Sequence, residues 1–118
     1  MPYVSLDLET TGLDHESDEI IEVAAIRFDV DGVIDRYHSL VNPGRGLEYR
    51  IERLTGINPD DLLTAPHFST LRAEVEAFIG LDPIVGQNPT FDTTFLARNG
   101  VTVFGPTFDT FDLASLLL

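Results

Sequence analysis

The sequence predicts one α/β domain with a mixed sheet, in which antiparallel hairpin strands are extended by a parallel strand and helices cover the faces. Three observations predict this class. The chain has strand-like patterning as far as Val41 and changes to helical spacing between residues 48 and 79. The short apolar run Ile84-Val85 follows, and another helical stretch comes after it. The expected order is β-β-β-α-α-β-α-α, and 118 residues suit a single domain.

The three N-terminal strands follow from alternation and from one turn signal. Tyr3–Glu9 alternates apolar and polar residues, and the segment 10–12 ends it. After an acidic loop, Ile20–Asp29 is a second, largely buried strand. Asp31-Gly32 is a two-residue hairpin signal, so we expect Val33–Val41 to pair antiparallel with the second strand.

The next part of the chain carries helix signals. Glu48–Leu54 is a short helix closed by Gly56, and Pro59 begins another single turn. A longer helix is expected from about His67 to Ile79, because its apolar residues fall on one face: Phe68, Leu71, Val75, Phe78 and Ile79.

The C-terminal third alternates between short elements and breaks. Ile84-Val85 is a strand, Gly86–Pro89 is a turn, and Thr90–Asn99 is a helix. A second break at Gly105-Pro106 precedes a final helix that we expect from about Thr110 onward.

Composition excludes several kinds of chemistry. The chain has 20 acidic residues against 7 arginines, a formal charge of −13, no cysteine and no lysine. Disulfides, thiolate zinc sites, cysteine nucleophiles and lysine-based catalysis therefore have no residues to use. The acidic balance argues against a purely electrostatic nucleic-acid binder, unless metal ions lie between the acids and a phosphate. Without a membrane-length apolar run or a signal-peptide pattern, we expect a cytoplasmic protein with no membrane partner.

Asp7 and Glu9 are the first candidates for a chemical role. They are two residues apart on a predicted strand, so both carboxylates project from one face of the sheet. They stand at the carboxyl end of the strand, where α/β sheets place ligand sites. Carboxylates this close repel unless a cation lies between them, and hard oxygen ligands suit Mg²⁺ or Mn²⁺. Spacing alone leaves open that they are two surface acids at a strand end.

At these residues the chain resembles a known family. Asp7–Leu13 (DLETTGL) resembles the first motif of the DEDD 3′–5′ exonucleases, which are DnaQ-like and have an RNase H-like fold. Gly86–Leu96 (GQNPTFDTTFL) resembles the second motif of their histidine-type branch. This branch includes polymerase proofreading subunits and the exonuclease domains of DinG-type helicases. Smaller landmarks follow in the family's order: Asn42-Pro43, Leu54–Ile57, and Phe108–Thr110 with Leu113-Ala114.

The resemblance implies a site with two metal ions. Asp7, Glu9 and Asp92 would coordinate two Mg²⁺ or Mn²⁺ ions at the scissile phosphate. One ion would activate the attacking water, and the other would stabilise the leaving 3′ oxygen. Asp92 also stands in the first turn of a predicted helix, where complementing the helix dipole is its alternative role.

The resemblance also implies contacts to the 3′-terminal nucleotide. Backbone N–H groups and an apolar contact would hold it at four consecutive residues: Thr10, Thr11, Gly12 and Leu13. Thr55 stands where the family contacts this nucleotide, with a small turn residue as the alternative. Asn88 would hydrogen-bond the site or only shape its turn. Phe91 would stack on a base or belong to the core.

The family's third motif, H-x-A-x-x-D, has no match in the chain. None of the histidines is followed by Asp five residues later: His15 is followed by Ile20, His38 by Pro43, and His67 by Arg72. We therefore expect the general base and the fourth acid past Leu118. The domain would then be incomplete at its C-terminus, where the apolar segment 113–118 has no cap. Such a chain would bind metal weakly and cleave poorly.

The expected function is removal of nucleotides from single-stranded or frayed DNA 3′ ends, with polymerase or helicase subunits or fused domains as partners. One alternative is an RNA 3′-end exoribonuclease of the RNase T or oligoribonuclease kind, which contacts to a 2′-OH would distinguish. Another is a non-catalytic module that binds a partner or a nucleic-acid end. A third, a magnesium-dependent hydrolase of small phosphates, suits the charge of −13 but gives Thr10 and Phe91 no role.

Overall fold

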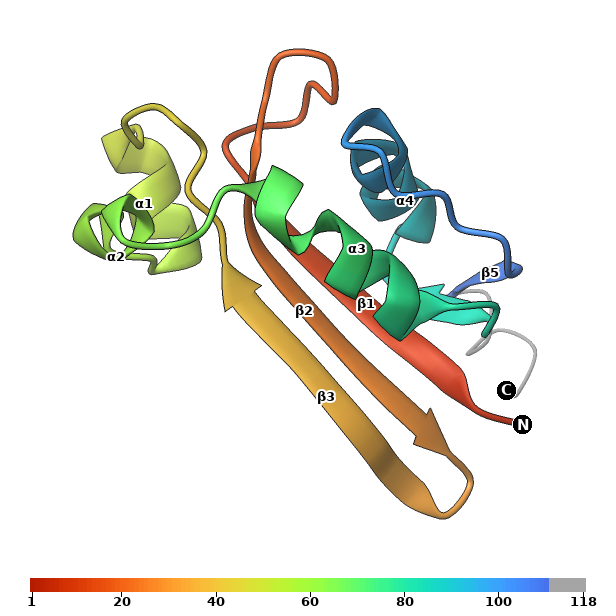
Figure 1. Cartoon of the computed structure of the whole chain (residues 1–118). Helices are drawn as coiled ribbons and strands as arrows, with labels where there is room; N and C mark the ends of the chain where they lie inside the picture. Colours follow the sequence, from red (N-terminus) through yellow and green to blue (C-terminus); the bar gives the residue numbers. More distant parts are fainter. Residues whose placement is uncertain (111–118) are drawn as a thin grey trace.

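The computed structural model describes residues 1–110, which form a mixed sheet with helices packed against it (Figure 1). The sheet has five strands in the order β3-β2-β1-β4-β5. β1 pairs antiparallel with β2, and β2 pairs antiparallel with β3, whereas β4 and β5 run parallel to β1. The predicted fold class is confirmed. The strands are β1 Tyr3–Thr10, β2 Ile20–Asp29, β3 Gly32–Leu40, β4 Ile84–Gly86 and β5 Thr107–Asp109.

Four helices accompany this sheet in the described part of the chain: α1 Tyr49–Thr55, α2 Pro59–Leu63, α3 Phe68–Ile79 and α4 Pro89–Arg98. In Figure 1, α3 crosses over β1 and β2, α4 lies beside β4 and β5, and α1 and α2 form a separate pair at the end of β3. The predicted helix end is confirmed at α1, which is capped after Thr55 by Gly56 with φ 73°. Pro59 begins α2, and Gly80 follows α3. None of these helices is long and apolar enough to cross a membrane.

The central strand β1 has the core on one face and the candidate acids Asp7 and Glu9 on the other. Val4, Leu6 and Leu8 are buried in one hydrophobic cluster with side chains of α3 and α4. Because successive side chains of a strand alternate between faces, Asp7 and Glu9 project from the opposite face. The register places Glu9 opposite Glu22 of β2.

The hairpin between β2 and β3 is one residue earlier than predicted. Asp29 pairs with Gly32, so the two loop residues are Val30 and Asp31 rather than Asp31 and Gly32. The Asp29 carboxylate accepts a hydrogen bond from the Asp31 N–H at 2.8 Å, which tightens the chain at this earlier point. Gly32 then begins β3 with φ 125°, a conformation that favours glycine. The predicted antiparallel pairing is confirmed.

Strand β5 was not predicted, because its three residues are mostly exposed and follow a Gly-Pro break. The strand forms by parallel pairing with β4, from Ile84 opposite Thr107 to Gly86 opposite Asp109. Gly105 lets the chain pass close to the segment between α3 and β4, since a Cβ there would lie 2.4 Å from the Asp82 carbonyl oxygen. The helix expected from about Thr110 lies almost wholly outside the described residues.

Candidate active site

Two neighbouring strands bring three acids to the same end of the sheet. β4 pairs in parallel with β1, so the chain leaves β4 at the end of the sheet where Asp7 and Glu9 stand. A turn at Asn88, in the left-handed conformation with φ 50°, leads directly into α4, whose first turn carries Asp92. The Asp92 side chain is buried, at 5% exposure. Asp7, Glu9 and Asp92 therefore come from two elements that converge on one site.

Burial and the charges of neighbouring acids raise the pKa of each of these acids. The pKa of Asp92 rises to about 7, chiefly because of burial and then because of the charges of Asp7 and Glu9. Burial also raises the pKa of Glu9, with the charges of Asp7 and Glu22 adding to it. The pKa of Asp7 rises through burial and the charge of Glu22. Since these effects are electrostatic, the acids are close enough to disfavour simultaneous ionisation.

The three acids suit hard divalent cations in kind. Carboxylate oxygens are the ligands that Mg²⁺ and Mn²⁺ prefer, and a cation between the acids would relieve the repulsion that raises their pKa values. Within residues 1–110, no group of three or more histidine, cysteine or acidic side chains is arranged as a ready metal site. The donor chemistry therefore fits such ions, while the side chains do not form a closed ligand set as they stand.

A cavity of about 280 Å³ adjoins Glu9 at this end of the sheet. It contains five of the seven residues predicted to contact a nucleotide, and these are Thr10, Gly12, Leu13, Thr55 and Phe91. Its remaining lining comes from Leu8 and from α1, through Arg50, Ile51 and Leu54. Leu13 and Leu54 are 85% and 80% exposed, so two large apolar side chains stand open to solvent at its rim. The cavity offers apolar surface beside a carboxylate.

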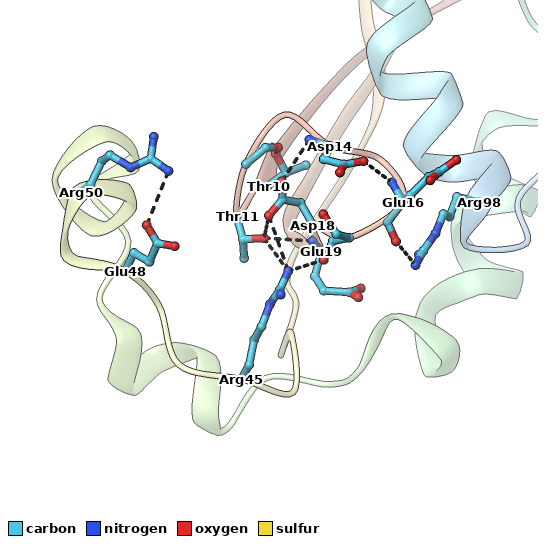
Figure 2. Close-up of polar contacts among 12 residues, drawn as sticks. Thr10, Thr11, Asp14, Glu16, Asp18, Glu19, Arg45, Glu48, Arg50 and Arg98 are labelled. Carbon is cyan, nitrogen blue, oxygen red and sulfur yellow. Dashed lines mark hydrogen bonds and ion pairs between the residues drawn. The ribbon is translucent and has the colours of Figure 1, made fainter.

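Thr11 does not line this cavity, and its hydroxyl forms hydrogen bonds within the protein (Figure 2). The hydroxyl donates to Asp18 Oδ1 at 3.0 Å and accepts from the Glu19 N–H at 3.0 Å. Arg45 Nη2 donates to the Thr11 hydroxyl oxygen at 2.9 Å. The Thr11 side chain therefore supports the loop after β1. The neighbouring Thr10 hydroxyl donates to the Gly12 carbonyl at 2.6 Å.

Asn88 also lies outside the cavity lining and shapes the turn before α4. Its N–H donates to Asp109 Oδ2 at 3.2 Å, and its side chain makes no capping bond to α4. Thr55 and Phe91 each combine two roles. The Thr55 hydroxyl donates to the Ile51 carbonyl at 2.8 Å while the residue lines the cavity. Phe91 lines the cavity and packs on Phe95, with 4.9 Å between ring centroids.

Two features of the site were missed from the sequence. Glu22 lies opposite Glu9, and its Oε2 is 2.7 Å from His38 Nε2 on β3. An acid between the apolar residues Ile21 and Val23 was the available signal, and the pairing of β1 with β2 places it opposite Glu9. Arg50 and Leu54 of α1 line the cavity, and an exposed leucine directly before the Thr-Gly-Ile landmark was the only hint of this.

Comparison with known proteins identifies the family. A family model described as exonuclease, of the RNase T kind, matches residues 4–117. The PolC-type DNA polymerase III of Thermotoga petrophila is 36% identical over 121 residues, which cover 98% of this chain and 9% of that protein. The DNA polymerase III subunit epsilon of Treponema pallidum is 35% identical over 94 residues, which cover 80% of this chain and 44% of that subunit. The chain thus spans less than half the length of either relative.

Solved structures agree on the fold. A structure of exonuclease I superposes with a TM-score of 0.81 at 21% identity, covering 98% of this chain and 29% of that one. Exonuclease I of E. coli in complex with a dA13 oligonucleotide superposes equally well, at 0.81. The resemblance to DnaQ-like exonucleases is confirmed by the family match and by this sheet. This chain belongs to the RNase T family of exonucleases.

Proposed function

We propose that this chain is the nuclease domain of a 3′–5′ exonuclease that removes nucleotides from DNA ends by phosphodiester hydrolysis. The observation that carries the proposal is the convergence of Asp7, Glu9 and Asp92, with pKa values raised by burial and by one another's or Glu22's charge. The open cavity beside Glu9 gives room for a nucleotide. DNA is the favoured substrate because the relatives are DNA polymerase III proteins.

Asp7, Glu9 and Asp92 are the proposed ligands of two divalent ions, Mg²⁺ or Mn²⁺. Bound ions of this kind neutralise charge on a phosphate and make water a better nucleophile. The chain's own contribution is to hold the acids against their repulsion. β1 fixes Asp7 and Glu9 on one face, and the first turn of α4 fixes Asp92 in a buried position.

The cavity is the proposed seat of the terminal nucleotide. Leu13, Leu54 and Phe91 offer apolar surface for a base, and every base has an aromatic face that such surfaces accept. Thr10 and Gly12 supply backbone close to Glu9. Recognition by apolar surface and backbone is tolerant of base identity, which suits an enzyme that removes nucleotides in succession.

Cleavage by the 118-residue chain alone is proposed to be slow. The proton-transfer group of the family's third motif has no counterpart among its histidines, since none is followed by Asp at the required spacing. We propose that the chain works with polymerase or helicase subunits or fused domains. Its relatives are bacterial replication proteins, so the cytoplasm is the proposed place of action.

A strand-shortening assay tests this function. Single-stranded DNA and RNA of one sequence, labelled at the 5′ end, are incubated with the chain and Mn²⁺, beside Asp7→Asn and the control Arg53→Ala. We expect slow loss of single nucleotides from the DNA 3′ end by wild type and by the control, and none by Asp7→Asn. Faster shortening of RNA would redirect the proposal to an exoribonuclease. Binding of the strand without any shortening, and without a requirement for metal, would overturn it in favour of a non-catalytic module.

A further inference from the structure

The loop between β1 and β2, residues 11–19, is held by arginines from two distant parts of the chain (Figure 2). Arg45 lies in the segment before α1, and Arg98 is the last residue of α4. The Arg98 guanidinium donates to the Glu16 carbonyl. The loop is acidic and mostly exposed to solvent, so these contacts from outside it add to the hydrogen bonds within it.

Arg45 makes the most extensive of these contacts. Its Nη2 donates to the Thr11 hydroxyl at 2.9 Å and to the Ser17 carbonyl at 2.8 Å. The same nitrogen lies 3.6 Å from Asp18 Oδ1. One terminal nitrogen of the guanidinium thus serves both the start and the end of the loop, 34 and 28 residues away along the chain. Charge-assisted hydrogen bonds of this kind are stronger than neutral ones.

Asp18, itself a residue of the loop, makes further contacts with it. Its Oδ1 accepts from the Thr11 hydroxyl, and its Oδ2 accepts from the Asp14 N–H at 3.0 Å. The carboxylate also lies directly against Gly12, since a Cβ there would be 2.3 Å from Asp18 Oδ2. Asp18 therefore packs against Gly12, a residue of the cavity.

These contacts join two walls of the cavity. One wall is the end of β1 with the loop residues Gly12 and Leu13, and the opposite wall is α1. Arg45 stands in the segment that leads into α1, four residues before Tyr49 begins that helix, and it bonds to the loop on the other wall. We name the set Thr11, Ser17, Asp18 and Arg45 the loop clamp.

We propose that Arg45 is a positioning residue, which uses the loop clamp to hold residues 10–13 at a fixed distance from α1 so that the cavity accepts a nucleotide. This inference rests on the proposed function, because it assigns the cavity to a DNA end. Arg45 itself does not line the cavity, so it acts through the residues it holds.

If Arg45 only stabilised the fold, Arg45→Ala would lower the unfolding midpoint. The Arg45 side chain is 45% exposed, and partly exposed ion pairs contribute little to global stability. The proposal therefore expects Arg45→Ala to leave the unfolding midpoint close to that of wild type while it loosens residues 10–13. Hydrogen–deuterium exchange of these amides is expected to speed up about tenfold, with exchange in β2 unchanged.

Strand binding gives the second readout. Fluorescence anisotropy with a 5′-fluorescein oligothymidylate and Mg²⁺ measures the Kd of the 118-residue chain. Arg45→Ala is expected to raise Kd about tenfold, the size expected when a charge-assisted network is lost. Arg45→Lys keeps the charge but not the fork of donors, so its Kd is expected to lie between those of wild type and Arg45→Ala. Arg53→Ala, an arginine of α1 whose side chain contacts Tyr49, is the matched control and should bind as wild type.

The outcomes separate this inference from the proposed function. Faster exchange in residues 10–13 together with the higher Kd supports the positioning role. Unchanged exchange in Arg45→Ala, or faster exchange with an unchanged Kd, overturns it. If wild type does not bind the strand but the exchange result holds, the proposed function fails and the clamp stands only as a loop support. If Arg45→Ala does not fold, Arg45→Lys and Asp18→Asn are read by the same two criteria.

Discussion

Two clusters of acids at different places on the sheet are treated in opposite ways. Arg27 of β2 lies between Asp82 and Asp35, with its Nε 3.1 Å from Asp82 Oδ2 and its Nη1 3.9 Å from Asp35 Oδ2. Its guanidinium also lies 4.5 Å above the Phe78 ring. At the other cluster, no arginine or histidine within residues 1–110 forms an ion pair with Asp7, Glu9 or Asp92.

The acids beside Arg27 stabilise the fold, whereas Asp7, Glu9 and Asp92 lower its stability when they ionise. Around Arg27, each carboxylate gains a cation, and the guanidinium also donates to the Phe78 carbonyl at the end of α3. At Asp7, Glu9 and Asp92 the pKa values are raised, so ionisation is disfavoured in the folded chain. The fold gains no stability from ionising these acids, so we propose a chemical role for this second cluster.

The largest expected effect comes from breaking the paired cluster, which is Arg27 with Asp35 and Asp82. Arg27→Met keeps much of the aliphatic packing but removes the cation from Asp82 and the donor from the Phe78 carbonyl. We expect a loss of about 2–3 kcal/mol of unfolding free energy in urea denaturation. Arg36→Met, on the exposed strand β3, is the control and should change little. Equal stability of both variants would show that Arg27 is not a structural centre.

Neutralising an acid of the unpaired cluster, which is Asp7, Glu9 and Asp92, is expected to raise the free energy of unfolding. The unfolded chain loses the Asp92 proton near 3.8, whereas the folded chain keeps it until about 7. The folded state therefore binds more protons between these values, and its stability falls as pH rises through that window. Asp92→Asn should stabilise the chain by about 2 kcal/mol at about pH 8 and by much less at about pH 5.

Asp82→Asn is the matched substitution in the paired cluster, and urea denaturation at the two pH values measures both. Asp82→Asn should destabilise at both, because the Arg27 guanidinium loses its closest anionic partner. A destabilising effect of Asp92→Asn at about pH 8 would contradict the contrast between the clusters.

Divalent ions are expected to act only on the unpaired cluster. At about pH 8, Mg²⁺ or Mn²⁺ should raise the thermal midpoint of the wild type by a few degrees, since a ligand that binds only the folded state stabilises it. The double variant Asp7→Asn/Asp92→Asn should show no such shift. Arg27→Met should keep the whole of it, despite its lower starting midpoint. A metal-induced shift in the double variant would move the ion site elsewhere.

The smallest expected effect concerns Glu22. Its charge raises the pKa of Asp7 and of Glu9, so Glu22→Gln should lower both titration midpoints slightly while leaving the fold intact. Carboxyl ¹³C chemical shifts followed against pH measure this. Unchanged midpoints in Glu22→Gln would show that Glu22 does not belong to the same electrostatic group.

Local sequence was sufficient for the elements with a strong apolar pattern. The predicted bounds of β2, Ile20 to Asp29, match those of the structure, and the spacing of its apolar residues predicted the buried face of α3. The shared face of Asp7 and Glu9 followed from alternation along β1. Strand β5 could not be predicted, because its exposed residues are ordered by pairing with β4 and not by burial.

The site shows the same limit. The inward orientation of the Thr11 hydroxyl depends on Asp18 and on Arg45, which lies far away along the chain. Local propensity carries no information about such a partner. Arg50 and Leu54 could not be predicted as cavity residues for the same reason. The place of α1 beside the end of β1 is a property of the tertiary structure.

We propose that Asp7, Glu9 and Asp92 form one carboxylate group that takes up a divalent cation. The most direct test is a ¹³C titration of the Asp92 carboxyl with and without saturating Mg²⁺, with Asp92→Asn used to assign the signal. Without Mg²⁺ the midpoint should lie at about 7. With Mg²⁺ it should fall by about one pH unit or more, because the bound cation favours the ionised form. The same midpoint in both titrations would contradict the account.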